Sequence, residues 1–259
     1  MNDCEQQARI ALDNQDWPAA IRLFRQALKD SPQDAELSLL LADALCEFDK
    51  ASEAVSVLEK ALEKHPGEVE LLFALGDLVF ELDDSGKALE CYREILRIDP
   101  EEGEAWASIG LVQYRQQCYV EAIDAYRTAA KLDGDSAFLF NCLGDAFLAQ
   151  DDTEQALVCY QKALKLDPQE AHTHLNMAEI YQERGDLVSA KAACCEAIAL
   201  DSELAEAYVA LGNICLDLDE TREALSSYQK FLAIEKSTVG REILAEVTAL
   251  VEGLKAEMS

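Results

Sequence analysis

The side chains of this chain that could support catalysis or metal binding are nine cysteines, three histidines and 51 acidic residues. The cysteines form no C-x-x-C motif, and the adjacent pair Cys194-Cys195 would point its side chains about 100° apart on a helix. His172 and His174 would lie on different faces of a helix, which does not suit a zinc site. There is no Gly-rich phosphate loop and no Ser/His/Asp set. We therefore expect no enzymatic activity, no cofactor and no metal site, and cysteines that act as small packing residues.

The remaining chemistry is that of the carboxylates, which give the chain a net charge of −29 at pH 7. This charge argues against nucleic acid and anionic lipid as ligands, because both need a positive surface. It is compatible with a basic partner, and also with charge that only serves solubility. No stretch approaches the length of uninterrupted apolar sequence that a membrane span requires. The first residues lack the basic and apolar regions of a secretory signal. We expect a cytoplasmic location and no membrane insertion.

The elements that must position these side chains follow from a strict repeat of 34 residues. An alanine recurs at this spacing, with a small residue twelve positions before it and usually an aromatic residue four positions after it. The alanines are Ala20, Ala54, Ala88, Ala122, Ala156, Ala190 and Ala224. A fixed period of this length indicates a repeat array rather than one globular core. The predicted repeats are 1–34, 35–68, 69–102, 103–136, 137–170, 171–204 and 205–238.

Each repeat is predicted to form two amphipathic helices, A and B. Positions 4, 7, 8 and 11 of a repeat share one face of helix A, and positions 20, 24, 27 and 28 share one face of helix B. We expect the small residue at position 8 to let a second backbone approach closely. Polar turns such as Asp151-Asp152-Thr153 separate the two helices and cap helix B. Pro32, Pro66, Pro100 and Pro168 end four of the repeats.

Over residues 1–238 this pattern resembles the tetratricopeptide repeat family, whose Trp, Leu-Gly, Tyr, Ala, Phe and Pro positions it follows. The resemblance implies an all-α fold, a right-handed superhelical α-solenoid in which the A helices line a concave groove. We treat the array as one elongated domain. Residues 239–259 leave the register but keep an amphipathic stripe, which predicts a C-terminal capping helix. The alternative is a helix that docks on a partner or on a second copy.

Acidic residues concentrate on the face of helix A opposite its packing positions, whereas most lysines and arginines lie in helix B. Helix dipoles account for acids at position 2, but not for those at positions 9 and 13, near the negative end of helix A. We interpret these acids as one wall of a binding groove. The alternative is the usual enrichment of charge at exposed positions. The acids predicted to contact a partner are Asp43, Glu47, Asp77, Glu81, Asp145, Glu179 and Glu183.

An apolar edge accompanies the acids along helix A. It lies beside the packing face, so the alternative is that its side chains are half-buried between adjacent A helices. The apolar residues predicted to contact a partner are Phe73, Phe80, Leu111, Tyr114 and Leu148.

The leading hypothesis is a protein–protein interaction scaffold or adaptor. It would hold an extended or helical, Lys/Arg-rich amphipathic segment of a partner protein in its acidic groove. Chaperone-binding members of the family grip acidic tails with Lys and Asn at positions 5 and 9, and this basic clamp is absent here. The alternative is a structural scaffold that self-assembles through its ends or its C-terminal helix. We therefore expect a monomer or a weak homo-oligomer. A thiol-responsive regulator is a third, weaker hypothesis.

Overall fold

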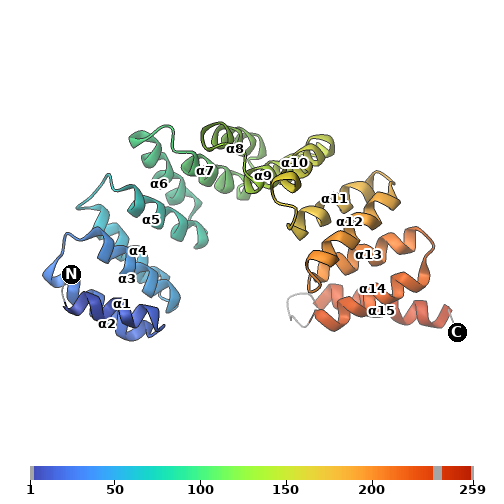
Figure 1. Cartoon of the computed structure of the whole chain (residues 1–259), viewed down its shortest axis with the longest axis horizontal. Helices are drawn as coiled ribbons and strands as arrows, with labels where there is room; N and C mark the ends of the chain where they lie inside the picture. Colours follow the sequence, from blue (N-terminus) through green and yellow to red (C-terminus); the bar gives the residue numbers. More distant parts are fainter. Residues whose placement is uncertain (1–2, 236–240, 258–259) are drawn as a thin grey trace. The chain divides into compact units, whose positions relative to one another are not determined.

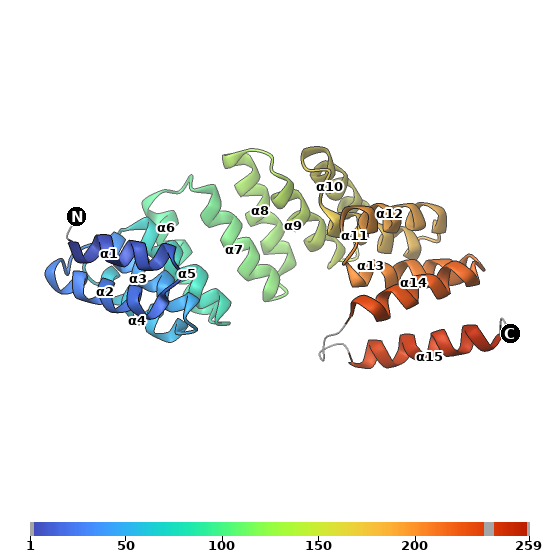
Figure 2. The same ribbon diagram turned by 60° about the horizontal axis from the view of Figure 1, so that its bottom comes forward.

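The computed structural model describes residues 3–235 and 241–257, and all regular structure in these residues is α-helical (Figure 1, Figure 2). The all-α fold class is confirmed. The chain divides into two compact units, unit 1 (Met1–Gly134) and unit 2 (Asp135–Ser259), and each is considered by itself. The single elongated domain stays a prediction, and the predicted boundary between 238 and 239 lies outside the described residues.

Helices follow one another as hairpins, and each hairpin packs on the next within its unit. The first helix of a hairpin is an A helix and the second is a B helix. The hairpins of unit 1 are α1 (Asp3–Asp13) with α2 (Trp17–Asp30), α3 (Ala35–Glu47) with α4 (Ala51–Leu62), α5 (Val69–Glu81) with α6 (Ser85–Ile98), and α7 (Gly103–Arg115) with α8 (Tyr119–Asp133). Those of unit 2 are α9 (Ala137–Leu148) with α10 (Thr153–Leu166), α11 (Ala171–Glu183) with α12 (Leu187–Leu200), and α13 (Ala205–Asp217) with α14 (Thr221–Ile234), followed by α15 (Arg241–Glu257). Among the described helices, none is both long and apolar enough to cross a lipid bilayer.

Polar turns cap four of the seven B helices in the way that the sequence predicts, whereas α4, α8 and α14 have no side-chain cap. In four hairpins an aspartate accepts a hydrogen bond from the backbone N–H three residues later, over 3.1–3.2 Å. These residues are Asp16, Asp84, Asp152 and Asp186. Such a cap stabilises a helix by about 1 kcal/mol. In α4 the same position holds Lys50, which makes no capping bond and puts a positive charge at the positive end of the helix dipole.

The small residue in the middle of the A helix accommodates an aromatic ring rather than a backbone. A Cβ atom at Gly144 would lie 2.4 Å from Cε1 of Tyr160, which is far inside van der Waals contact. The same arrangement joins Gly76 to Tyr92, Gly110 to Tyr126 and Gly212 to Tyr228. The expected close approach of a second backbone is therefore replaced by the approach of a tyrosine from helix B. Hairpins with alanine in the A helix carry no tyrosine there, but Phe24, Leu58 or Cys194.

Helix α15 packs an apolar face against the last hairpin of unit 2. Val247, Val251 and Leu254 are buried and share a core with Tyr228 and Phe231 of α14. This is the packing that we expect of a capping helix. The alternative of docking on a second molecule stays a proposal.

Candidate functional site

Three of the four predicted acids of α3 and α5 line one hollow on the A-helix face of unit 1. Asp43 comes from α3, and Asp77 and Glu81 come from α5. All three side chains are exposed, as is Glu47 on the next turn of α3. The hollow has a volume of about 220 Å³, and its other lining residues are Ala42, Cys46, Leu58, Ala74 and Leu78. It therefore combines carboxylates at its edge with a mostly apolar lining.

At the hollow, α4 carries Leu58 where four other B helices carry a tyrosine. Leu58 is only 1% exposed and brings neither a ring nor a hydroxyl group to this space. In the next hairpin the Tyr92 hydroxyl donates a hydrogen bond to Asp77 Oδ1 over 2.6 Å. Asp43 has no such donor in α4. Burial raises the pKa of Asp43 above its ordinary value, and the neighbouring Glu47 carboxylate raises it further.

Cys46 lies among these acids but does not suit thiol chemistry. Partial burial raises the pKa of its thiol, and the negative charges of Asp43, Glu81 and Glu47 add to that effect. Because the thiolate is the reactive form, a raised pKa makes this cysteine a poor nucleophile. The hollow is therefore better suited to binding a cation than to reacting with a substrate.

The predicted apolar edge of unit 1 is half-buried, although the ring contacts of Phe73 and Tyr114 are to B helices and not to adjacent A helices. The Phe73 ring lies 6.3 Å from the Tyr92 ring, and the Tyr114 ring lies 5.5 Å from the Tyr119 ring. Leu111 and Phe80 are half-buried as well. The two ring contacts lie within a hairpin, α5–α6 and α7–α8, and these side chains leave only part of their surface for a partner.

Phe80 has a partner that the sequence analysis missed. The guanidinium carbon of Arg115, at the end of α7, lies 3.5 Å from the centroid of the Phe80 ring. Arg115 also donates hydrogen bonds to the Phe80 carbonyl oxygen over 2.6 Å and to Asp83 over 3.2 Å. The sequence contained one signal for this contact, because Arg115 is a basic residue on the mostly acidic face of helix A. Its reach to α5 depends on how the two A helices pack.

In unit 2 two of the four predicted residues are half-buried. Asp145 is half-buried and accepts hydrogen bonds from the Tyr160 hydroxyl over 2.7 Å and from Asn176 Nδ2 over 3.1 Å. Leu148 is half-buried too, whereas Glu179 and Glu183 of α11 are exposed. The two bonds to Asp145 join α9, α10 and α11, so this carboxylate helps to hold the fold. A single groove along all the A helices stays a prediction, and the candidate site is the hollow of unit 1.

One further cluster in unit 2 has the composition of a metal site. Ligand atoms of Cys215, Glu220 and Glu223 lie within 4.8 Å of one another. The ammonium group of Lys191 donates hydrogen bonds to both carboxylates. These bonds raise the pKa of Lys191, so it stays charged and offsets one of the two negative charges. The cluster is an ion-pair network in which lysine already takes the place of a cation.

Residues 5–203 match the family model of the cilia and flagella-associated protein 70 C-terminal domain, and residues 207–239 match a tetratricopeptide repeat model. No curated protein matches the chain.

Solved structures share its fold. A tetratricopeptide repeat protein from Parabacteroides merdae is 20% identical, with a TM-score of 0.75 over 96% of this chain and 98% of that chain. YrrB, described as a TPR protein with an unusual peptide-binding site, is 20% identical, with a TM-score of 0.57 over 72% of this chain and 96% of that chain. Yeast Tom70 is 16% identical, with a TM-score of 0.66 over 93% of this chain and 59% of that chain. At these identities the likeness shows the fold alone.

Proposed function

Because the chain belongs to the family of the cilia and flagella-associated protein 70 C-terminal domain, which is built of tetratricopeptide repeats, we propose that it is a non-catalytic protein interaction scaffold. Arrays of this kind expose long surfaces made of neighbouring repeats, and these surfaces suit extended or helical segments. The peptide-binding site named for YrrB supports this mode of action by analogy of fold.

The proposed ligand is a Lys/Arg-rich amphipathic segment of a partner protein, bound at the hollow of unit 1. The observation that carries this proposal is the group of Asp43, Asp77 and Glu81 around a hollow that Leu58 also lines. A lysine or arginine can lay its aliphatic stem along the apolar lining while its charged end meets the carboxylates. Glu47 would extend the acidic surface on α3. In unit 2, Glu179 and Glu183 offer exposed carboxylates to the same kind of segment.

Fluorescence polarisation with a short labelled peptide of alternating lysine and leucine tests this proposal, with a glutamate/leucine twin as comparison. The basic peptide should bind, and its affinity should fall with added salt, because charges are screened over about 8 Å at physiological ionic strength. The triple variant Asp43→Asn, Asp77→Asn, Glu81→Gln should bind about tenfold more weakly, since several exposed charge pairs are lost together.

A matched control neutralises exposed acids of the B helices of unit 1 by Glu90→Gln, Glu121→Gln and Asp124→Asn. It removes the same charge from another face and should leave the affinity nearly unchanged. The proposal fails if both peptides bind equally well, or if the control loses as much affinity as the triple variant.

A cytoplasmic location and the absence of a nucleic-acid ligand are also part of the proposal. All nine cysteines are free thiols, which is usual in a reducing compartment. The net charge of −29 would repel a polyanion.

The second candidate function is self-assembly through α15. Ile243 is 50% exposed, and a hollow of about 350 Å³ is lined by Leu250, Leu254 and their neighbours on this helix. An apolar side chain of a second copy could fill it. Size-exclusion chromatography with light scattering decides the matter. A mass of 28.6 kDa at every concentration would exclude assembly, whereas oligomers that disappear in a Leu250→Glu variant would support it.

A further inference from the structure

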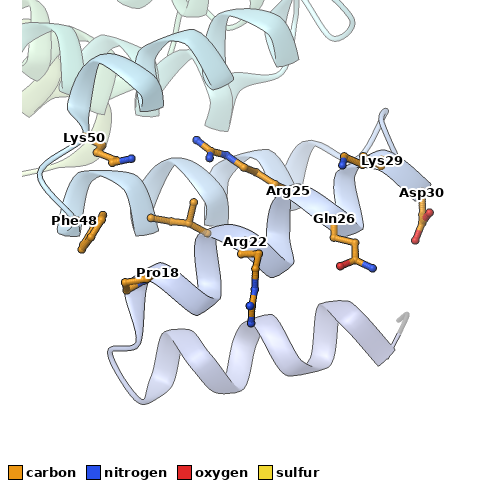
Figure 3. Close-up of a pocket in the computed structure, with 9 residues that line it drawn as sticks. Pro18, Arg22, Arg25, Gln26, Lys29, Asp30, Phe48 and Lys50 are labelled. Carbon is orange, nitrogen blue, oxygen red and sulfur yellow. The ribbon is translucent and has the colours of Figure 1, made fainter.

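A second cavity in unit 1 carries the opposite charge and lies along the B helix α2 (Figure 3). Its volume is about 680 Å³, which is within the usual range for ligand pockets. Helix α2 contributes Arg22, Arg25 and Lys29, and the turn between α3 and α4 contributes Lys50. Asp30 is the acidic residue of the lining. In a chain with a net charge of −29, four cations on one cavity are unexpected.

Pairing within the chain neutralises only part of this charge. Arg25 forms an ion pair with Glu53, and Lys50 Nζ lies 3.0 Å from the same carboxylate. In the part of the chain that the structure describes, neither Arg22 nor Lys29 forms an ion pair with a carboxylate. The cavity therefore has unpaired positive charge that can bind an external anion.

Lys50 gives a further indication that this charge serves a ligand. It occupies the position where Asp16, Asp84, Asp152 and Asp186 cap other B helices. Cys118 of α8 and Glu220 of α14 make no capping bond there either, but Lys50 is the one residue at this position that carries a positive charge. The hairpin thus gives up a stabilising residue for one that opposes the helix dipole. Exceptions of this kind to local rules are concentrated at functional sites.

The cavity also has an apolar edge. Phe48 is 42% exposed at the end of α3, and the Lys50 ammonium lies 5.8 Å from the centre of its ring. Pro18, at the start of α2, lines the same cavity. A ligand that fits must therefore combine negative charge with an apolar group.

We propose that this cavity binds an acidic segment of a partner protein. Its carboxylates meet Arg22, Lys29 and Lys50, and an apolar side chain next to them packs on Phe48. The planar guanidinium of Arg22 suits a carboxylate, with which it can form two parallel hydrogen bonds. Nucleic acid and anionic membranes fit less well, because they present extended negative surfaces that the many acids elsewhere on the chain would repel. The site is separate from the acidic hollow, so unit 1 would bind two segments of opposite charge.

The test is fluorescence polarisation with a short labelled peptide of glutamates around one central phenylalanine, with a lysine twin as comparison. The decisive variant is Arg22→Ser, Lys29→Ala, Lys50→Asp. Each new residue is one that the chain itself carries at the same position of another hairpin, as in Ser56, Ala199 and Asp84, so we expect the fold to be kept. The variant should bind the acidic peptide about tenfold more weakly than the intact chain. The charge-matched control, Arg93→Glu with Arg97→Glu on α6, makes the chain more negative by the same amount and should bind the peptide as tightly as the intact chain.

The proposal is overturned if the acidic peptide binds no better than its lysine twin, or if the control variant loses as much affinity as the decisive one. Binding of phosphatidylserine vesicles or duplex DNA without binding of the peptide would assign the cavity to another ligand class. Oligomers that disappear in the decisive variant would assign it to a second copy. The variant Asp43→Asn, Asp77→Asn, Glu81→Gln should keep its affinity for the acidic peptide, so this proposal and the proposed function can fail separately.

Discussion

Two hairpins of the same design, α3–α4 in unit 1 and α9–α10 in unit 2, differ at the residues that lock a hairpin together. In α9–α10 the Tyr160 ring packs on Gly144, its hydroxyl donates to Asp145, and Asp152 caps α10. In α3–α4 the equivalent residues are Ala42, Asp43, Lys50 and Leu58. Only the acid remains, and it has lost its tyrosine partner.

Equivalent residues therefore stabilise the fold in α9–α10 and line exposed sites in α3–α4. Asp145 is held by α10 and α11, whereas Asp43 lines an open hollow. Lys50 lines the cationic cavity, whereas Asp152 stabilises its helix. Natural proteins commonly give up stability where a site is needed. We interpret α3–α4 as the hairpin where this exchange was made.

The largest expected effect tests the ring contact. Gly144→Ala should lower the free energy of unfolding by about 2 kcal/mol, because the new Cβ atom would overlap the Tyr160 ring. The reverse change in the other hairpin, Ala42→Gly, should cost only about 1 kcal/mol, the difference in helix propensity. Urea denaturation followed by circular dichroism measures both.

A double-mutant cycle shows whether the ring is the cause. In a Tyr160→Leu background, which reproduces the alanine–leucine pair of α3–α4, Gly144→Ala should cost much less than it does alone. An equal cost in both backgrounds would mean that the contrast between the hairpins has another origin.

The next effect concerns the tyrosine hydroxyl. Tyr160→Phe should lower the free energy of unfolding by about 1.5 kcal/mol, because the half-buried Asp145 carboxylate loses one of its two hydrogen bonds. Tyr92→Phe should cost less, about 0.5–1 kcal/mol, since water can replace the lost donor at the exposed Asp77. Urea denaturation measures both variants. Equal losses of unfolding free energy would contradict the distinction between Asp145, which supports the fold, and Asp77, which is exposed to a ligand.

Much of this contrast was present in the sequence. The 34-residue period of alanines predicted the helix pairs, and the aspartates of the polar turns predicted the caps. The pairing of glycine at position 8 with tyrosine at position 24 could also have been predicted, because both residues change together in α1–α2, α3–α4 and α11–α12. It was missed because the contact joins two helices across their interface.

The two surfaces could be predicted less well. Acids at positions 9 and 13 indicated an acidic face, but hydrogen bonds to tyrosine decide which acids are held, as for Asp145. Arg115 covers Phe80 through the packing of neighbouring A helices, which no spacing within one helix reveals. The cationic cavity combines α2 with the turn that precedes α4, and each part looks ordinary by itself. Sequence periodicity describes a repeat, whereas these sites depend on contacts between repeats.

A smaller effect, of opposite sign in the two hairpins, tests the presence of lysine instead of aspartate at the N-cap of α4. Lys50→Asp should raise the free energy of unfolding by about 1 kcal/mol, because the new carboxylate can cap α4 and favour its dipole. Asp152→Lys should lower it by a similar amount, since it removes the bond to the Gln155 N–H. Thermal unfolding of both variants measures the two shifts. If Lys50→Asp is destabilising, Lys50 has a role in the fold and its value as an indication of a ligand site is lost.

The smallest effect concerns the charge of Asp43. Burial and Glu47 raise the pKa of Asp43 in the folded protein, so the folded state binds this proton more readily than the unfolded state does. Ionisation of Asp43 therefore costs stability at neutral pH, and this cost disappears as the pH falls through the raised pKa. Asp43→Asn should be more stable than the intact chain by about 0.5 kcal/mol or less at neutral pH, because the carboxyl is only partly buried, and equally stable in acid.

Affinity for the basic peptide should follow the opposite trend. Asp43→Asn should bind it more weakly at neutral pH, and the difference should vanish in acid, because Asp43 of the intact chain is then neutral as well. Urea denaturation and fluorescence polarisation, each at neutral and acidic pH, measure the two quantities on the same pair of proteins. If Asp43 serves ligand binding, Asp43→Asn must raise stability and lower affinity over the same pH range. If Asp43→Asn instead lowers both, the carboxylate supports the fold, and the contrast between Asp43 and Asp145 disappears.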